Sequence, residues 1–89
     1  MDYEWDPRKD LFNQNKHGIG FDALQGFDWD SAVVLPDERH DYGERRWLAT
    51  GFLDGHLHSV AFTIRGSKIR PISLRRASLK ERRLYDEQG

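Results

Sequence analysis

The sequence predicts a small α+β domain with an N-terminal helix or helices, an antiparallel β-meander of about four strands and a C-terminal helix. Three observations support this class. Asp6-Pro7 begins a helix-compatible segment, as an N-cap followed by a first-turn proline does. Aromatic and branched residues flank Asp54-Gly55, a two-residue signal typical of a β-hairpin. Ser78 and Glu81 have the spacing of a helical capping box. The length suits one domain over residues 1–89.

The N-terminal third is expected to be helical. A first helix runs from Pro7 to Asn15 and closes at Gly18, since glycine readily ends helices. A second turn or short helix is expected around residues 21–26, before a polar cluster at Asp28, Asp30 and Ser31. Two apolar side chains of this region should face inward, Leu24 and Phe27.

The middle of the chain is expected to form the sheet. The predicted strands cover residues 32–35, 45–53, 56–65 and 68–75, and a polar loop at 37–44 follows Pro36. Because Pro71 cannot donate to a strand ladder, the last strand should be an edge or carry a bulge there.

Alternation divides this sheet into an apolar face and a polar, cationic face. The apolar face should hold Val60, Phe62, Ile64, Ile72 and Leu74. The other face should hold Ser59, Ala61, Thr63, Arg65, Ser73 and Arg75. The final helix should begin at Ser78 and end near Tyr85 or Glu87, with Leu79 inward and three cations in water, Lys80, Arg82 and Arg83.

Charge is sorted along the chain although the net charge is only -1. Residues 1–44 contain four Lys or Arg and eleven Asp or Glu, whereas residues 65–83 contain eight Lys or Arg and one Glu. If the fold keeps them apart, the basic part could bind a phosphate backbone. The alternative is two solvated faces that pair with each other.

Composition also bears on the cellular compartment. The chain has no cysteine, so disulfides and thiolate metal sites are excluded, and a reducing cytoplasm is the expected location. No basic start precedes an apolar run, and no stretch approaches the roughly 20 apolar residues of a membrane span. We therefore expect neither a signal peptide nor a membrane association.

Three blocks of residues, in order along nearly the whole chain, resemble the BrnT family of type II toxin-antitoxin toxins. The first block contains Tyr3-Glu4-Trp5-Asp6, Lys9, Asn13, Lys16-His17-Gly18 and Phe21. The second contains Asp37-Glu38-Arg39-His40 and Gly43-Glu44-Arg45-Arg46-Trp47. The third contains Thr63-Ile64-Arg65, Ile69-Arg70, Ile72-Ser73, Arg75-Arg76-Ala77, Glu81-Arg82-Arg83 and Tyr85. Pro71 and Leu74 depart from the family pattern, which usually has a strand-friendly apolar residue and a small residue there.

The resemblance implies a RelE-like fold and an endoribonuclease that arrests translation. It also implies a ribbon-helix-helix, BrnA-like antitoxin, with two toxins on an antitoxin dimer as a 2:2 heterotetramer. That antitoxin would repress the shared operon, so operator DNA would be contacted only through it.

RNA cleavage without a metal or other cofactor needs a base for the 2′-hydroxyl, an acid for the leaving oxygen and cations for the growing phosphate charge. Arg65 and Arg75 are the leading candidates for the cations, with structural salt bridges as the alternative. His40 and Glu44, in the polar loop, are candidates for proton transfer; the alternative is a solvated loop whose acid groups pair with Arg39 or Arg45. Tyr85 could orient the phosphate or stack on a base, although core packing is the more frequent role.

Further cations could hold the RNA backbone, and these are Lys16, Arg70, Arg76, Lys80 and Arg83. Lys16-His17-Gly18 is also typical of an ordinary cationic helix end, which is the interpretation we favour. The basic run at 75–83 could equally be the surface that an acidic antitoxin segment grips. His56 and His58 lack a third metal ligand at a suitable spacing, so we expect no metal site.

Two other classes of function compete with the enzyme. One is a non-catalytic module that binds nucleic acid or protein, and the other is a purely structural subunit. Catalytic and anchoring arginines look alike in a sequence, so substitutions that separate RNA turnover from RNA binding are needed to discriminate them.

Overall fold

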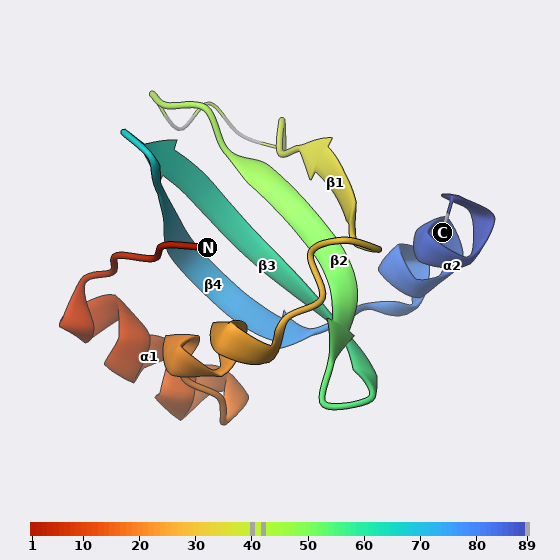
Figure 1. Cartoon of the computed structure of the whole chain (residues 1–89), viewed down its shortest axis with the longest axis horizontal. Helices are drawn as coiled ribbons and strands as arrows, with labels where there is room; N and C mark the ends of the chain where they lie inside the picture. The colour runs from red at the N-terminus through yellow and green to blue at the C-terminus, as the bar shows by residue number, and fades with distance from the viewer. Residues whose placement is uncertain (40, 42, 89) are drawn as a thin grey trace.

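The computed structural model describes residues 1–39, 41 and 43–88. The elements are α1 (Pro7–His17), η1 (Phe21–Gly26, a 3-10 helix), β1 (Val33–Pro36), β2 (Trp47–Leu53), β3 (His56–Arg65), β4 (Lys68–Arg76) and α2 (Leu79–Gln88) (Figure 1). The strands form one antiparallel sheet in the order β1-β2-β3-β4. The predicted α+β class, with a helix at each end of a meander, is confirmed.

The element boundaries follow local chemistry. The Asp6 side chain accepts a hydrogen bond from the Arg8 N–H at 2.9 Å, and Gly18 ends α1 with a φ of 74°. At the β2–β3 turn, Asp54 and Gly55 have φ values of 50° and 77°, as the predicted two-residue hairpin requires. Helix α1 extends to His17, two residues beyond the predicted Asn15.

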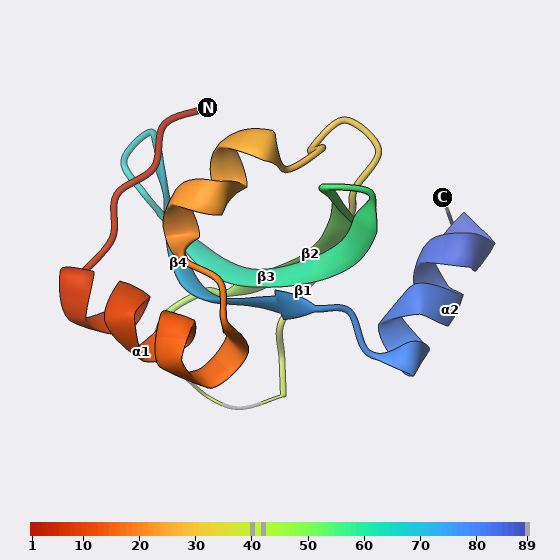
Figure 2. The same ribbon diagram turned by 90° about the horizontal axis from the view of Figure 1, so that it is seen from below.

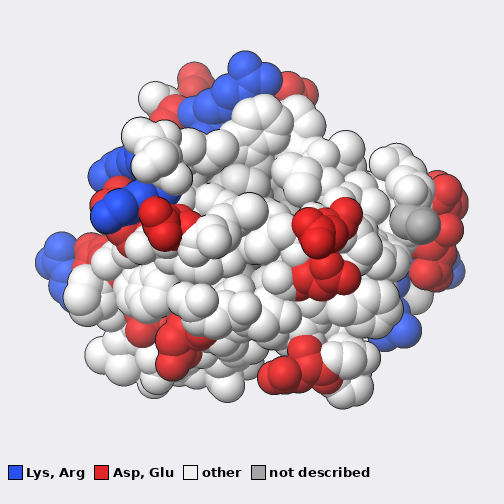
Figure 3. Space-filling model, in the orientation of Figure 1, with Lys and Arg blue, Asp and Glu red and all other residues white. Residues whose placement is uncertain are grey.

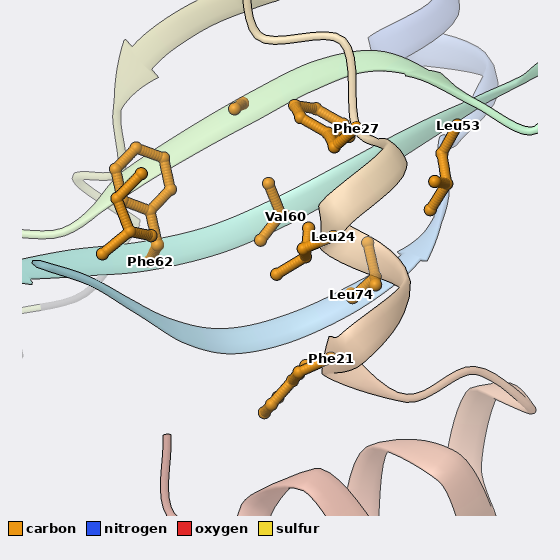
Figure 4. Close-up of a cluster of buried hydrophobic side chains, with 9 residues drawn as sticks. Phe21, Leu24, Phe27, Leu53, Val60, Phe62 and Leu74 are labelled. Atoms are coloured by element: carbon orange, nitrogen blue, oxygen red, sulfur yellow. The ribbon is translucent and has the colours of Figure 1, made fainter. Parts of the chain in front are cut away.

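The hydrophobic core lies between η1 and one face of the sheet. Phe21, Leu24 and Phe27 point from η1 and its C-cap toward the sheet (Figure 4). The sheet contributes the buried residues Ala49, Leu53, Val60, Phe62, Ile69 and Leu74. Gly51 lies under the segment that follows η1, where an added Cβ would come within 3.0 Å of the Phe27 ring. The short helix predicted around residues 21–26 is therefore the main cover of the core.

The two longer helices lie on opposite sides of the molecule, α1 beside β4 and α2 against β2, while η1 covers one face of the sheet (Figure 2). Helix α1 is held against β4 by Asn13, a residue that is only 2% exposed. Its Nδ2 donates to the carbonyl oxygens of Ile19 and Leu74, both at 2.8 Å, and its Oδ1 accepts from the Leu74 N–H at 2.9 Å. Asn13 thus fixes the backbone of β4 immediately before Arg75.

The last strand combines both of the features expected from Pro71. β4 is an edge of the sheet, and the β3–β4 register shifts where Ala61 pairs with Ser73 but Phe62 pairs with Pro71. Ile72 is the extra residue of this bulge. The prediction that Ile72 shares the core face with Leu74 was wrong, because the bulge interrupts the alternation and Ile72 lines a surface hollow beside Phe12 instead.

Two further side-chain predictions need correction. Ile64 follows the core-facing alternation but is 55% exposed, because it lies near the end of β3, beyond the cover that η1 provides. Leu79, expected to face inward, is 63% exposed, and the α2 residues that face the rest of the molecule are Glu81, Leu84 and Tyr85. The polar face of β3 is also more enclosed than expected, since Ser59, Ala61 and Thr63 are all buried.

Candidate active site

The face of the sheet opposite η1 carries an ion pair between β4 and α2. Arg75 donates from Nη1 to Glu81 Oε1 at 2.7 Å and from Nη2 to Glu81 Oε2 at 2.9 Å. This end-on, bidentate geometry is the strong form of an Arg–carboxylate pair. The side chains are 27% and 13% exposed, so the pair lies in a half-buried position. It joins the predicted cation Arg75 to a carboxylate that sequence reasoning considered only as a helix cap.

Glu81 is fixed by further hydrogen bonds. Ser59 Oγ on β3 donates to its Oε1 at 2.8 Å, and Thr50 Oγ1 on β2 lies 2.9 Å from Ser59 Oγ. The Ser78 N–H also donates to Glu81 Oε1 at 2.9 Å, and the Glu81 N–H donates to Ser78 Oγ at 3.2 Å. The predicted capping box is confirmed. A polar chain therefore crosses from β2 through β3 to the first turn of α2 and ends at Arg75.

Hydrogen bonds from Arg75 lower the pKa of Glu81 to about 2 and those same bonds raise the pKa of Arg75. His17, at the end of α1, also lies in the field of Arg75. Burial lowers the pKa of His17, and the positive charges of Lys16 and Arg75 lower it further. His17 is therefore mostly neutral near pH 7 and can accept a proton.

Arg39, in the polar loop, interacts electrostatically with this site. Its positive charge acts to lower the pKa of Arg75, against the effect of Glu81. Arg39 donates to the buried carboxylate of Asp37 from Nε and Nη2, both at 2.8 Å. These bonds lower the pKa of Asp37. The same loop provides Glu44, whose Oε1 lies 3.3 Å from Arg46 Nε in an ion pair. His40, the other predicted proton-transfer residue, lies outside the described residues.

The structure does not bring Arg65 next to Arg75. Arg75 pairs with Ser59 across the sheet, and Arg65 lies six residues farther along β3, at its exposed end. At the rise of an extended strand, that separation is roughly 20 Å. Tyr85 is half-buried, with its ring edge-on to Phe52 at 5.6 Å between centroids and its hydroxyl 3.4 Å from Ser31 Oγ. These contacts are those of a packing residue at the rim of the site.

The predicted RNA-binding cations lie on different elements. Lys16 is on α1, 5.9 Å from the centroid of the Phe12 ring, and Arg70 of β4 is 3.8 Å from Glu4. Arg76 Nη2 lies 3.3 Å from His56 Nδ1. Lys80 and Arg83 line a hollow on α2, together with Leu79, Leu84 and Glu87.

Charge also separates in space. On the face covered by η1, Asp and Glu side chains occupy the middle, whereas Lys and Arg side chains lie near the margins (Figure 3). Asp22, Asp28 and Asp30, all exposed, belong to η1 and the segment after it. On the opposite face lies Arg75, and the positive charge of Arg39 is close enough to act on it. A polyanion would therefore meet less repulsion on the Arg75 face than on the η1 face.

Within the described residues, no group of three metal-ligating His, Asp or Glu side chains comes together. His58 is buried and its Nδ1 lies 2.8 Å from the His56 carbonyl oxygen. Among the described helices, none is long and apolar enough to cross a membrane.

The ion pair makes a pH prediction. Because folding lowers the pKa of Glu81 from 4.5 to about 2, its contribution is complete above pH 4.5 and is lost as the pH falls toward 2. At pH 7, Glu81→Gln should be less stable than the wild type by roughly 3 kcal/mol, and this difference should close in acid. Urea unfolding of both proteins from pH 7 to pH 2 measures it. A difference that stays constant with pH would contradict the strong ion pair.

These features define a class of protein: a compact α+β domain whose sheet presents an ion-paired arginine and neighbouring cations opposite its core. A family model described as the ribonuclease toxin BrnT of type II toxin-antitoxin systems matches residues 5–81. The chain therefore belongs to the BrnT family.

A solved structure supports this assignment. The 1.1 Å crystal structure of the Brucella abortus ribonuclease toxin BrnT is 33% identical to this chain, with a TM-score of 0.70. The match covers 88% of this chain and 97% of that one. No match was found among curated proteins. The resemblance seen in the sequence is thus confirmed at the level of family and fold.

Sequence reasoning missed several members of the site. Glu81 and Ser59 were assigned to a helix cap and to a strand face, and His17 was favoured as part of a helix end. Arg39 was considered only as a partner for loop acids. The strand alternation that puts Ser59 and Arg75 on the same polar face could have indicated Ser59. Their pairing across the sheet, however, depends on the bulge at Ile72.

Proposed function

We propose that this chain is an endoribonuclease toxin that cleaves RNA without a metal ion and so inhibits translation. The observation that carries this proposal is the orientation of Arg75, held by Glu81 on the polar face of the sheet in a member of the BrnT family. A guanidinium so placed can contact a phosphodiester and stabilise the negative charge that grows on its oxygens.

The chemistry proposed is attack of the ribose 2′-hydroxyl on the adjacent phosphorus. A base removes the 2′-hydroxyl proton, the P–O5′ bond breaks, and an acid protonates the leaving 5′-oxygen. The products are a 2′,3′-cyclic phosphate and a 5′-hydroxyl end. This step needs only proton transfer and charge stabilisation, which His, Glu and Arg side chains supply.

The proposal gives a role to each candidate residue. Arg75 contacts the reacting phosphate, and His17, kept mostly neutral near pH 7, joins His40 and Glu44 as a candidate for proton transfer. Arg65 is proposed to contact the RNA backbone at a distance from the reacting phosphate, and Tyr85 to support the rim of the site. Further backbone contacts are proposed for Lys16, Arg70, Arg76, Lys80 and Arg83.

The partner proposed is a BrnA-like, ribbon-helix-helix antitoxin in a 2:2 heterotetramer that contacts operator DNA through the antitoxin alone. Membership of a type II toxin-antitoxin family supports an antitoxin partner. We propose that the complex works in the cytoplasm, which agrees with a chain that has no cysteine.

The chemistry is tested with purified protein and a single-stranded RNA of mixed sequence, with and without EDTA. Cleavage that persists in EDTA and leaves 2′,3′-cyclic phosphate ends is expected. Cleavage that requires Mg²⁺, or that leaves 3′-hydroxyl ends, would contradict the mechanism. A matched RNA with 2′-O-methyl groups should resist cleavage, and adding the toxin to a cell-free translation reaction measures the effect on translation.

A further inference from the structure

We propose that Glu81 is a positioning residue that aims the guanidinium of Arg75 at the substrate phosphate. This inference rests on the proposed function, because it assigns a role to the partner of Arg75 rather than to Arg75 itself. Glu81 acts from the first turn of α2, so the helix becomes part of the site although none of its described residues is buried.

Glu81 occupies one edge of the Arg75 guanidinium and leaves another edge for the substrate. A guanidinium has five N–H groups, and the Glu81 pair occupies the end formed by Nη1 and Nη2. Nη1 also donates to the Arg76 carbonyl oxygen at 3.3 Å. The Nε–H has no partner among the described residues, and it points to the same side as the remaining N–H of Nη2. This second edge is a two-donor fork that fits two phosphate oxygens.

Glu81 is itself held by hydrogen bonds from two elements. Ser59 Oγ donates to it from β3, and the Ser78 N–H donates to it from the start of α2. A carboxylate constrained in this way can fix the plane of the guanidinium that it binds. A surface salt bridge between two mobile side chains would give no such orientation.

The negative charge of Glu81 also balances positive charges around Arg75. Arg75 shares its surroundings with Arg39 and with Lys16 beyond His17, so it lies among positive charges. The negative charge of Glu81 offsets that repulsion and keeps the guanidinium on the sheet. Without Glu81, the long Arg75 side chain would turn toward water, and its approach to the phosphate would have to be made during each encounter with RNA.

Chemical rescue by free guanidinium ion tests this role. In Arg75→Ala, millimolar guanidinium chloride should occupy the vacated site against Glu81 and raise RNA cleavage roughly tenfold over an equal concentration of NaCl. The double variant Arg75→Ala/Glu81→Gln should show no such rise. It carries no unpaired partner of the pair, so its fold should survive, and its Tm checks this. Arg75→Ala/Glu87→Gln is the matched control, because it loses an exposed glutamate of the same helix and should be rescued like Arg75→Ala.

The single variant Glu81→Gln gives an independent readout. It should lower kcat about tenfold while KM changes little, because the lost orientation matters most in the transition state. Glu81→Asp keeps the carboxylate on a side chain one methylene shorter and should recover part of this loss.

The outcomes separate the two proposals. If Arg75→Ala cleaves RNA as fast as the wild type, the proposed function of Arg75 fails. If Arg75→Ala is inactive and guanidinium either fails to rescue it or rescues Arg75→Ala/Glu81→Gln equally well, Arg75 keeps its function and the positioning role of Glu81 is overturned. An unchanged kcat in soluble Glu81→Gln would also overturn it.

Discussion

Arg75→Ala is expected to lower the rate of RNA cleavage by about 10²–10³-fold, the usual cost of removing one donor that stabilises transition-state charge. The measurement is kcat/KM on the RNA that the wild type cleaves. The substitution removes the cation but leaves Glu81 hydrogen-bonded to Ser59 and Ser78, so the fold should persist. RNA binding, followed by fluorescence anisotropy under conditions that prevent turnover, should fall much less than kcat.

The matched control is Arg82→Ala, which removes an equal charge from an exposed position next to Glu81 in the sequence. Its kcat should stay close to that of the wild type. Equal losses of RNA binding and of toxicity in Arg75→Ala would instead favour the non-catalytic binding module. Near-normal cleavage in that variant would remove Arg75 from the reaction.

Asn13→Ala is expected to lower the free energy of unfolding by about 3 kcal/mol. The side chain makes three hydrogen bonds to backbone groups of Ile19 and Leu74, and its loss leaves the buried amide and carbonyl of Leu74 without these partners. Urea denaturation monitored by tryptophan fluorescence measures the change.

Asn15→Ala is the control, because Asn15 is exposed on the same helix and its loss should change stability by less than about 0.5 kcal/mol. Asn13→Ala should also reduce cleavage at temperatures where it stays folded, since Asn13 holds the backbone next to Arg75. Equal stabilities of the two variants would show that α1 is not anchored through Asn13.

Most of the fold could be predicted because its signals are local. Three of these signals each act within a few residues and can therefore be recognised in the sequence: Asp6-Pro7, Asp54-Gly55 and the Ser78–Glu81 capping box. The predicted strand limits agree with the structure to within two residues. Pro71 indicated an edge or a bulge, and β4 has both. The burial of three residues was predicted wrongly, Ile64, Ile72 and Leu79. Burial depends on which other elements cover a side chain, and the spacing of apolar residues along a strand or helix does not predict that cover.

The site was less predictable for the same physical reason. Alternation put Arg75 on the polar face, but its partner Glu81 is brought there because only two residues separate the end of β4 from α2, whose first turn lies beside Ser59 of β3. Glu81 had a sufficient local explanation as a capping residue, which concealed its second contact. Arg65 and Arg75 share a predicted face of the sheet. Alternation predicts the face of a side chain but not how far apart two side chains on that face lie.

The most direct test of the central idea, a ribonuclease toxin that depends on Arg75, is induced expression of the chain alone in bacteria beside its Arg75→Ala variant. Growth and soluble protein are followed, and total RNA is mapped for new 5′ ends. We predict growth arrest with discrete RNA cuts for the wild type, and normal growth with intact RNA for the variant. Normal growth and uncut RNA with soluble wild-type protein would contradict the account, as would identical cuts in both cultures.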